Sequence, residues 1–574
     1  MRLVLISLAW MLLWLGGFYA VWPLAWPDEA LFSSPAAALA TSGRLITPVL
    51  QGLIPGMDQA TLWNSPLFMT LLAGIYKICG ESQLVGRLFS FSLAALVLIS
   101  LQTYARQRQV SRGWQVLILF TLVLDLSFLR SANTIRMDML TLLWILMASL
   151  LLLSEHHRFF QGNPDAPQYS LIELIRADLP VRSRWLALLA GLATGLAAMS
   201  HPIAIMLLPI IVIITLPRLR LWPWIAAGSL AALTPWLVYI ARHLDLFRLQ
   251  FGMQLQRKQD IFNLISGDTG GAWKVFISQN GGGKLAMGLT VLWIGITLGL
   301  AGFYLAVRLR QSGRQGRALW PASDWRMALV WIAVTTLVFI SSEGWYTLYV
   351  MPFLLVCCLE LQAADLLQGH NTAWQAIKEL WPRTEQPPFT WRALMEPELA
   401  GRRVMTLILL ISLGFALSTM LIFAVREKLI WQQRASVTQL NDWLLTNSQT
   451  CQSVYLRLRP DPYFLLRTRR PDLEVLEFVP GKLSLYPLQG PTERSALWPA
   501  AFPDESMARS WLFRRYDTID CFILDDHMNW EPVLEQYLRP RSEWQLQRGH
   551  FGQLEAVTIW QRKKDTQSAQ TNRN

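Results

Sequence analysis

Long apolar runs, separated by short charged loops, fill roughly the first three quarters of the chain. Most of the runs approach the roughly 20 residues that a helix needs to cross a hydrocarbon core about 30 Å thick. All are uncharged except Gly113 to Leu129, which contains Asp125 about one turn from its end. The pattern predicts an α-helical polytopic membrane protein with about 11–13 spans. The runs are Leu3 to Trp26, Leu88 to Ala105, Gly113 to Leu129, Met139 to Ser154, Trp185 to Ser200, Pro202 to Pro217, Leu221 to Ala241, Leu285 to Val307, Met327 to Ser342, Gly344 to Leu359 and Val404 to Val425.

The segment around His201-Pro202 needs a separate interpretation. Residues Trp185 to Pro217 carry no charge and are too numerous for a single span. Because the residue before a proline disfavours the helical conformation, the His-Pro step predicts a hairpin between two spans.

Two further segments do not have the pattern of spans. Residues 27–87 hold an Ala-rich piece and an apolar piece that opens at Ser65-Pro66-Leu67, and we expect both to lie along the membrane surface as interfacial helices. After Val425, short β-like runs alternate with helix-prone pieces, which predicts a small soluble α/β domain. The chain thus divides into a transmembrane domain, 1–425, and a C-terminal domain, 426–574. The β-like runs are Ser453 to Leu458, Leu473 to Phe478, Ile519 to Leu524 and Ala556 to Trp560.

Composition agrees with this division. Hydrophobic residues make up 53% of the chain and charged residues only 16%, against roughly 25% charged in soluble domains. The net charge of +12 is assigned to loops at the anionic lipid surface. No motif supports nucleic-acid binding, so we expect membrane lipids and no nucleic acid as partners.

Basic residues indicate the orientation. If the N-terminus is cytoplasmic, the short inside loops carry arginines, as the positive-inside rule requires; they include Arg106, Arg108, Arg112, Arg158, Arg182, Arg184, Arg218, Arg220, Arg308 and Arg310. The outer loop from Arg242 to Lys284 is also basic, which speaks against this orientation. An odd number of spans then places residues 426–574 outside. The same count gathers charged residues on the outer face: Asp28, Glu29, Arg87, Arg136, Asp138, His201 and Glu343.

Two of the five cysteines, Cys451 and Cys521, fall in the C-terminal domain. An oxidising compartment would allow them to form a disulfide, and two free buried thiols are the alternative.

The adjacent acids Asp28 and Glu29 follow the first apolar run directly. Ionisable groups close to lipid are costly and are usually functional, which favours a binding or catalytic site here. The alternative is a pair of solvated acids at a helix end.

The order of motifs resembles that of the aminoarabinose transferase and protein O-mannosyltransferase (family 39) group, membrane glycosyltransferases of superfamily C. The resemblance covers roughly residues 1–425 and departs from the family at Ser65, Gly86, His201 and Trp345. The last two stand where the family commonly has basic residues. The motifs that carry it are Asp28-Glu29, Arg44 with Pro48, Ser65-Pro66-Leu67, Gly86-Arg87-Leu88, Arg136-Met137-Asp138, the Gly-rich run Gly191 to His201, and Tyr349-Val350-Met351-Pro352.

The resemblance implies sugar transfer, with inversion, from a polyprenyl-phosphate donor to an envelope glycolipid, polysaccharide or protein. It implies a bacterial inner-membrane enzyme with a periplasmic C-terminal domain. Asp28, Glu29 and Asp138 would be catalytic, and Arg44, Glu343 and Tyr346 would line the acceptor or sugar pocket. The donor phosphate would be bound by residues from the set Arg87, Arg136, His201, Arg257, Lys258 and Tyr349. A divalent metal ion, if any, would use Glu29 and His201, although no close metal-ligand spacing occurs.

Each of these residues has a structural alternative. Arg87 and Arg136 could extend to lipid headgroups. The role of His201 could be limited to capping a helix at the hairpin. Tyr346 and Tyr349 could belong to an interfacial aromatic belt. Arg257-Lys258 is most simply a solvated pair of charges.

Two other function classes compete with the transferase hypothesis. A lipid-linked sugar flippase would show internal repeats or broken helices with charges near the midplane, and the sequence shows neither. An envelope protein without enzymatic activity would use its C-terminal domain to bind partners and would tolerate changes at Asp28.

Overall fold

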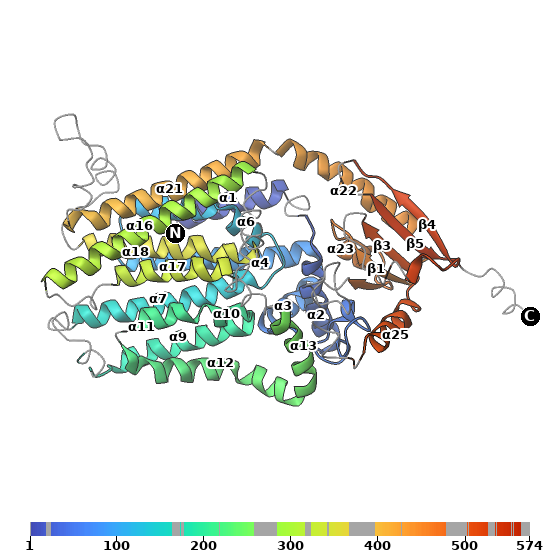
Figure 1. The fold of residues 1–574 in the computed structure, drawn as a ribbon, viewed down its shortest axis with the longest axis horizontal. Coiled ribbons are helices and arrows are strands. Elements are labelled where there is room, and N and C mark those ends of the chain that lie inside the picture. The colour runs from blue at the N-terminus through green and yellow to red at the C-terminus, as the bar shows by residue number, and fades with distance from the viewer. Residues whose placement is uncertain are drawn as a thin grey trace, which may run out of the picture.

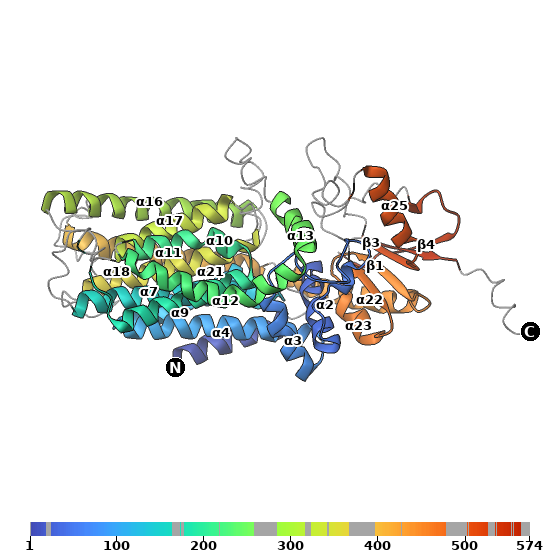
Figure 2. The same ribbon diagram turned by 90° about the horizontal axis from the view of Figure 1, so that it is seen from below.

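The computed structural model describes residues 2–18, 24–162, 173, 177–216, 218–257, 284–315, 323–340, 344–366, 397–425, 427–477, 502, 504–525, 534, 537–552, 554 and 556–563. A bundle of long helices forms one part, and a five-stranded sheet with flanking helices forms the other (Figures 1 and 2). Helices α2 (Pro27–Ser42) and α3 (Leu67–Cys79) lie between the bundle and the sheet. The predicted class, a helical membrane protein with a small C-terminal α/β domain, is confirmed.

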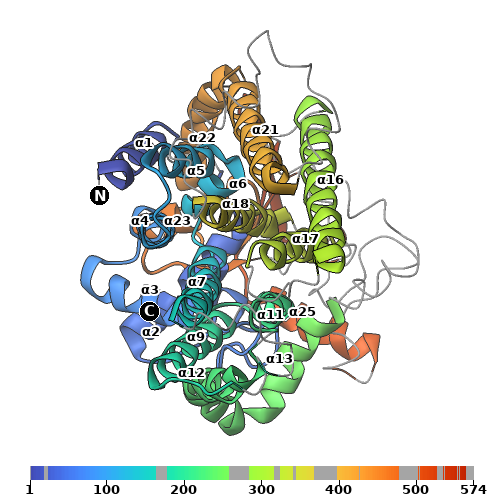
Figure 3. The same ribbon diagram turned by 90° about the vertical axis from the view of Figure 1, so that its left-hand side faces the viewer.

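The bundle is built from the apolar runs of the sequence. Figure 3, which looks onto the left-hand side of Figure 1, shows these helices side by side and nearly end on. Five helices of the described residues are long and apolar enough to cross a membrane: Gln83–Gln107, Asp138–Phe160, Leu219–Arg242, Gly288–Arg310 and Thr406–Phe423. Shorter apolar helices cover Arg2–Leu13, Leu67–Cys79, Ile203–Thr215, Trp325–Phe339 and Tyr346–Glu360. The bounds of the main bundle helices are α1 Arg2–Phe18, α4 Gln83–Gln107, α7 Asp138–Gly162, α9 Val181–Ser200, α12 Trp222–Arg242, α16 Lys284–Gln315, α17 Asp324–Ile340, α18 Val350–Leu366 and α21 Pro397–Val425.

The run from Gly113 to Leu129, predicted as one span, contains a break in its helix. It divides into α5 (Arg112–Leu124) and α6 (Leu126–Ala132), which are bent by 67°. Asp125 causes the break, because its backbone is extended and its carboxylate accepts the Phe128 N–H at 3.1 Å as the N-cap of α6. The one acid in an apolar run therefore marks a helix start.

The His201-Pro202 step breaks the helix as predicted. Helix α9 ends at Ser200, and His201 is extended. The chain continues through α10 (Ile203–Met206) into α11 (Leu208–Thr215), which returns along the bundle (Figure 1). At the far end of this return, Arg326 bonds both the Ile214 carbonyl and His156, near the end of α7.

The glycine-rich part of α9 packs against α12. A Cβ atom at Gly191 would collide with the Ile225 carbonyl, and one at Gly228 would collide with the Leu188 carbonyl. The Ser229 hydroxyl donates to the Gly191 carbonyl at 2.9 Å. Small residues allow this close approach between helices in a membrane. The glycines therefore set how closely α9 packs against α12.

A buried group of charged residues lies at the other end of the bundle from α2 and α3. The fully buried Glu360 of α18 accepts from the Arg108 side chain at 3.2 Å and lies 2.6 Å from His157 Nε2. Tyr104 and Ser323 also donate to it. Because these partners come from α4, α7 and the start of α17, the carboxylate ties the ends of four helices together.

The C-terminal sheet has the strand order β2-β1-β3-β5-β4. Strands β1 to β3 pair in parallel, whereas β5 runs antiparallel to both β3 and β4. Four strands match the predicted β-like runs: β1 Ser453–Arg457, β2 Glu474–Glu477, β3 Cys521–Asp525 and β5 Val557–Arg562. Strand β4 (Trp544–Gly549) was missed, since only its ends are buried and its middle is polar. The accompanying helices are α22 Glu427–Asn447, α23 Tyr463–Arg469 and α25 Glu505–Tyr516.

A disulfide joins Cys451 and Cys521, as the sequence had suggested, with their Cα atoms 6.0 Å apart. It connects the start of β1 to the start of the adjacent β3, at the centre of the sheet.

Candidate active site

The first turn of α2 presents two carboxylates at the end of the bundle nearest the sheet. Pro27 occupies the first helical position, where its missing N–H costs nothing, and the Glu29 N–H donates to the Trp26 carbonyl at 2.9 Å. Acidic residues in a first turn also interact favourably with the helix dipole. The sequence Trp-Pro-Asp-Glu therefore starts a helix and fixes two adjacent acids at its tip.

Glu29 is buried and fully engaged. Arg87 donates to both of its oxygens, from Nε and Nη2, at 3.0 Å each. The Gln83 side chain and the Ile135 backbone N–H donate to it as well, at 3.0 Å each. The exposed fractions of the Glu29 and Arg87 side chains are 1% and 0%. This arrangement connects α2, α4 and the segment before α7, and it favours a structural role for Glu29 over the predicted catalytic one.

Asp28 belongs to a second, more accessible chain of charges. Arg136 donates from one guanidinium nitrogen to Asp28 and from Nε to Asp138 Oδ2, the latter at 2.8 Å. Asp28 is 21% exposed, whereas Arg136 and Asp138 are 9% and 1% exposed. Asp138 Oδ1 is buried and has no hydrogen-bond partner among the described residues. Of the three predicted catalytic carboxylates, Asp28 is the most exposed to solvent.

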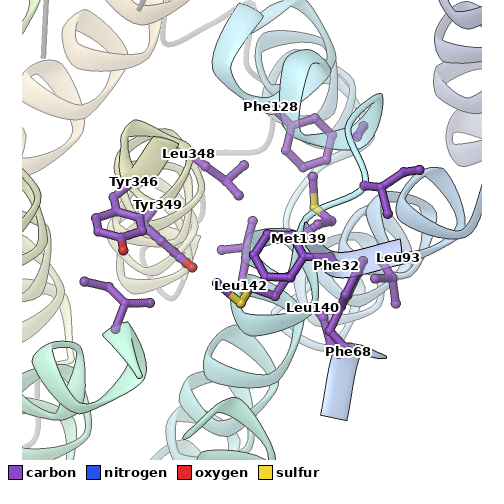
Figure 4. Packing of buried hydrophobic residues seen from close by; sticks show 14 of the residues in the cluster. Phe32, Phe68, Leu93, Phe128, Met139, Leu140, Leu142, Tyr346, Leu348 and Tyr349 are labelled. Atoms are coloured by element: carbon purple, nitrogen blue, oxygen red, sulfur yellow. The ribbon is translucent and has the colours of Figure 1, made fainter. Parts of the chain in front are cut away.

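Two tyrosines close this region on the side of α18. Tyr349, in the short helix η4 (Gly344–Tyr349), donates to the Asp138 carbonyl at 3.3 Å. Tyr346 lies 3.3 Å from His201 Nε2. Both rings are buried, and Figure 4 shows the Tyr349 side chain pointing toward the cluster that includes Leu142, Met139 and Phe32. The tyrosines therefore pack against the site and do not form an exposed aromatic belt.

His201 acts as a helix cap in this structure. Its Nδ1 accepts the Ile203 N–H at 2.8 Å, so this nitrogen carries no proton, and Nε2 faces the Tyr346 hydroxyl. A neutral, fully engaged imidazole does not supply the positive charge that donor-phosphate binding would need. The capping alternative fits the geometry better than the phosphate-binding prediction.

The suggested metal ligands do not fit a metal ion. Both Glu29 oxygens are occupied by donors, and both His201 nitrogens are engaged. Within the described part of the chain, no group of three or more His, Cys, Asp or Glu side chains could hold a metal ion.

Four other predicted residues are not placed in the site. Arg44 is exposed beyond the C-terminal end of α2 and donates to the Asp58 carbonyl, roughly 24 Å along the helix from Asp28. Arg257 ends α13 (Leu244–Arg257), and its side chain lies outside the described residues. Lys258 and Glu343 also lie outside them.

The C-terminal domain contacts the segment that carries the two acids. The Arg459 guanidinium lies over the Trp26 ring, 3.2 Å from its centroid, and the Asp461 N–H donates to the Ala25 carbonyl at 3.0 Å. Tyr463 donates to Glu81 at 2.6 Å, just before α4. No local sequence pattern indicates these contacts, because over 380 residues separate Tyr463 from Glu81.

An open cavity of about 360 Å³ separates α2 from the C-terminal domain. Its polar end is formed by Glu81, Tyr463 and Arg467, and its apolar wall includes Ala37 and Val475. Asp28 does not line it, but the cavity runs along the helix that begins with Asp28.

Two buried carboxyl groups of the C-terminal domain face the site. Burial raises the pKa of Asp461 to about 7, and the nearby charge of Glu29 acts in the same direction. Burial, together with the charge of Asp461, raises the pKa of Glu477 well above its ordinary value. Both groups therefore hold protons in the folded protein at a pH where they would be ionised in the unfolded chain.

We expect this proton uptake to make the protein less stable as the pH rises. Since the pKa of Asp461 increases on folding from 3.8 to about 7, its contribution falls between these values by about 1.4 kcal/mol per pH unit. The replacement Asp461→Asn should flatten this part of the curve. Unfolding of the full-length protein, followed by tryptophan fluorescence between pH 5 and 8, measures the slope. Asp442→Asn, on the exposed face of α22, is the control; equal slopes in Asp461→Asn and wild type would contradict the assignment.

Comparison with known proteins identifies the fold. No protein-family model matches the sequence, and no curated protein matches it. The crystal structure of ArnT from Cupriavidus metallidurans bound to undecaprenyl phosphate aligns over 97% of this chain and 97% of its own, with 14% identity and a TM-score of 0.52. The apo state of the same protein aligns over 96% and 97%, also with 14% identity, and a TM-score of 0.50. These alignments cover both the helical bundle and the C-terminal domain. The chain therefore has the fold of these ArnT structures.

Proposed function

We propose that this protein is an inverting glycosyltransferase that transfers a sugar from a polyprenyl-phosphate carrier to an envelope glycolipid, polysaccharide or protein. One observation carries the proposal. Asp28, a partly exposed carboxylate held by Arg136, lies at the end of a membrane bundle whose fold is shared with a protein bound to undecaprenyl phosphate.

The chemistry assigns separate tasks to the charged residues. The acceptor hydroxyl needs a carboxylate that orients it or takes its proton, and Asp28 is the accessible one. Charge builds on the phosphate oxygens as the glycosidic bond breaks, and a cation must stabilise it. Attack by the hydroxyl on the face opposite the leaving phosphate inverts the anomeric carbon. Arg136 holds Asp28 in place through an ion pair. The ion pair between Glu29 and Arg87 fixes α2 against α4.

We place the site on the outer side of the bacterial inner membrane, with the N-terminus cytoplasmic and the C-terminal domain periplasmic. The disulfide between Cys451 and Cys521 supports this placement, because such bonds persist in oxidising compartments. The arginines at the opposite end, such as Arg108 and Arg218, agree with a cytoplasmic face.

A reconstituted transfer assay tests the function. Full-length protein in lipid nanodiscs, supplied with polyprenyl-phosphate-linked labelled sugars and candidate acceptors, should produce labelled acceptor with the opposite anomeric configuration. Nuclear magnetic resonance of the product determines the configuration. Retention of configuration would contradict inversion, and a complete absence of transfer across donors and acceptors would contradict the enzyme assignment.

A flippase for lipid-linked sugars is the second candidate. The bent pair α5 and α6 favours it, because transporters commonly contain broken helices, a feature that the sequence had not revealed. Movement of labelled carrier lipid across proteoliposome membranes without any sugar transfer would support this candidate over the transferase.

A further inference from the structure

Backbone hydrogen bonds at Arg459 and at Asp461 hold this segment next to the site. The Arg459 N–H donates to the Asp525 carboxylate at 3.1 Å. Two residues later, the Asp461 N–H donates to the Ala25 carbonyl at 3.0 Å. The guanidinium carbon lies over the Trp26 ring, 3.2 Å from its centroid. An aromatic support of this kind holds a guanidinium in place without using its N–H donors.

The surroundings of Arg459 differ from those of the buried arginines that the bundle places near the acids. Arg87 and Arg136 are buried and bonded to carboxylates. Arg459 is exposed, and within the described residues its guanidinium makes no ion pair within 4 Å. Partial burial lowers the pKa of Arg459, while the negative charges of Asp525 and Asp28 act in the opposite direction. Arginine ordinarily loses its proton only in strongly alkaline solution, so the group carries a positive charge at neutral pH.

Arg459 brings a positive charge close to the negatively charged Asp28. A substrate that carries a phosphate is repelled by the Asp28 carboxylate it must approach. The His201 ring is neutral, and Arg136 already forms ion pairs with two carboxylates. Neither residue therefore has a positive charge available for a substrate. A planar guanidinium with its edge free can bind two phosphate oxygens at once.

We propose that Arg459 binds a phosphate group of the substrate beside Asp28, so that the C-terminal domain contributes a binding residue to the site. This inference rests on the proposed function, since it identifies the substrate as phosphate-bearing. The phosphate belongs either to the polyprenyl donor or to a phosphorylated glycolipid acceptor, and the two sources have the same chemistry at Arg459.

Binding measurements on the full-length protein in nanodiscs test the proposal. The probes are undecaprenyl phosphate against neutral undecaprenol, and a phosphorylated glycolipid against the same lipid after phosphatase treatment. Arg459→Gln should weaken binding of one phosphorylated probe by about ten- to a hundredfold and leave its neutral counterpart unchanged. Arg459→Lys should lose less, because it keeps the charge but not the two-pronged geometry. Arg469→Gln, an exposed arginine on α23, is the matched control and should bind like wild type.

The outcomes separate the sources and the hypotheses. Loss confined to undecaprenyl phosphate assigns the donor phosphate, and loss confined to the glycolipid assigns the acceptor. Unchanged binding of both phosphorylated probes by Arg459→Gln, at an unfolding temperature equal to that of wild type, would overturn the proposal. If wild type bound a phosphorylated probe through Arg459 but transferred no sugar, the proposed function would fail while the binding role of Arg459 would stand.

Discussion

Replacing Asp28 by Asn is expected to reduce sugar transfer by about 10²–10⁴-fold or more, the range typical for loss of a general base. The amide cannot take a proton from the acceptor hydroxyl. It keeps an oxygen that can accept from Arg136, and the position is partly exposed, so the fold should be little affected. Initial rates of transfer in nanodiscs measure the loss, and the unfolding temperature reports on the fold.

The neighbouring Asp58→Asn provides the matched control. Asp58 is exposed and lies in the same segment between α1 and α4, outside the first turn of α2. It should keep wild-type rates. If Asp28→Asn were fully active, Asp28 could not be the residue that activates the acceptor, and the transferase hypothesis would lose the observation that carries it.

The main elements of the fold were predictable because each has a local pattern. Uncharged runs of the right length became bundle helices, and the His201-Pro202 step became a break because proline restricts its neighbour. The kink at Asp125 was missed, since a single acid in an apolar run can either face a partner or cap a helix. Strand β4 was missed because its alternation of buried and exposed positions is incomplete.

The site was predictable only in part. Topology alone gathered Asp28, Arg136 and Asp138 at one end of the bundle, and the structure links them directly. Which acid pairs with which arginine was not encoded locally, since Glu29 and Arg87 are 58 positions apart. Arg459 lies in a different domain, so no pattern around Asp28 could indicate it. Long-range pairings of this kind become visible only when the helices are packed.

Removing Arg87 is expected to have the largest effect on stability. Arg87→Ala would leave the Glu29 carboxylate buried with only two neutral donors, and losing one partner of a buried ion pair costs about 3–5 kcal/mol. Thermal unfolding of the detergent-solubilised full-length protein measures the change. The exposed Arg44→Ala, in the same part of the protein, should change the free energy of unfolding by less than about 0.5 kcal/mol.

The partner variant separates a structural from a catalytic role for Glu29. Glu29→Gln leaves the Arg87 charge buried and should also lower the unfolding temperature, and combining Glu29→Gln with Arg87→Met should cost less than the sum of the single changes. Any loss of transfer should then follow the loss of folded protein. If Glu29→Gln instead kept the wild-type unfolding temperature and lost transfer as completely as Asp28→Asn, Glu29 would be a second catalytic carboxylate. The ion pair with Arg87 would then position that carboxylate for chemistry, in addition to tying α2 to α4.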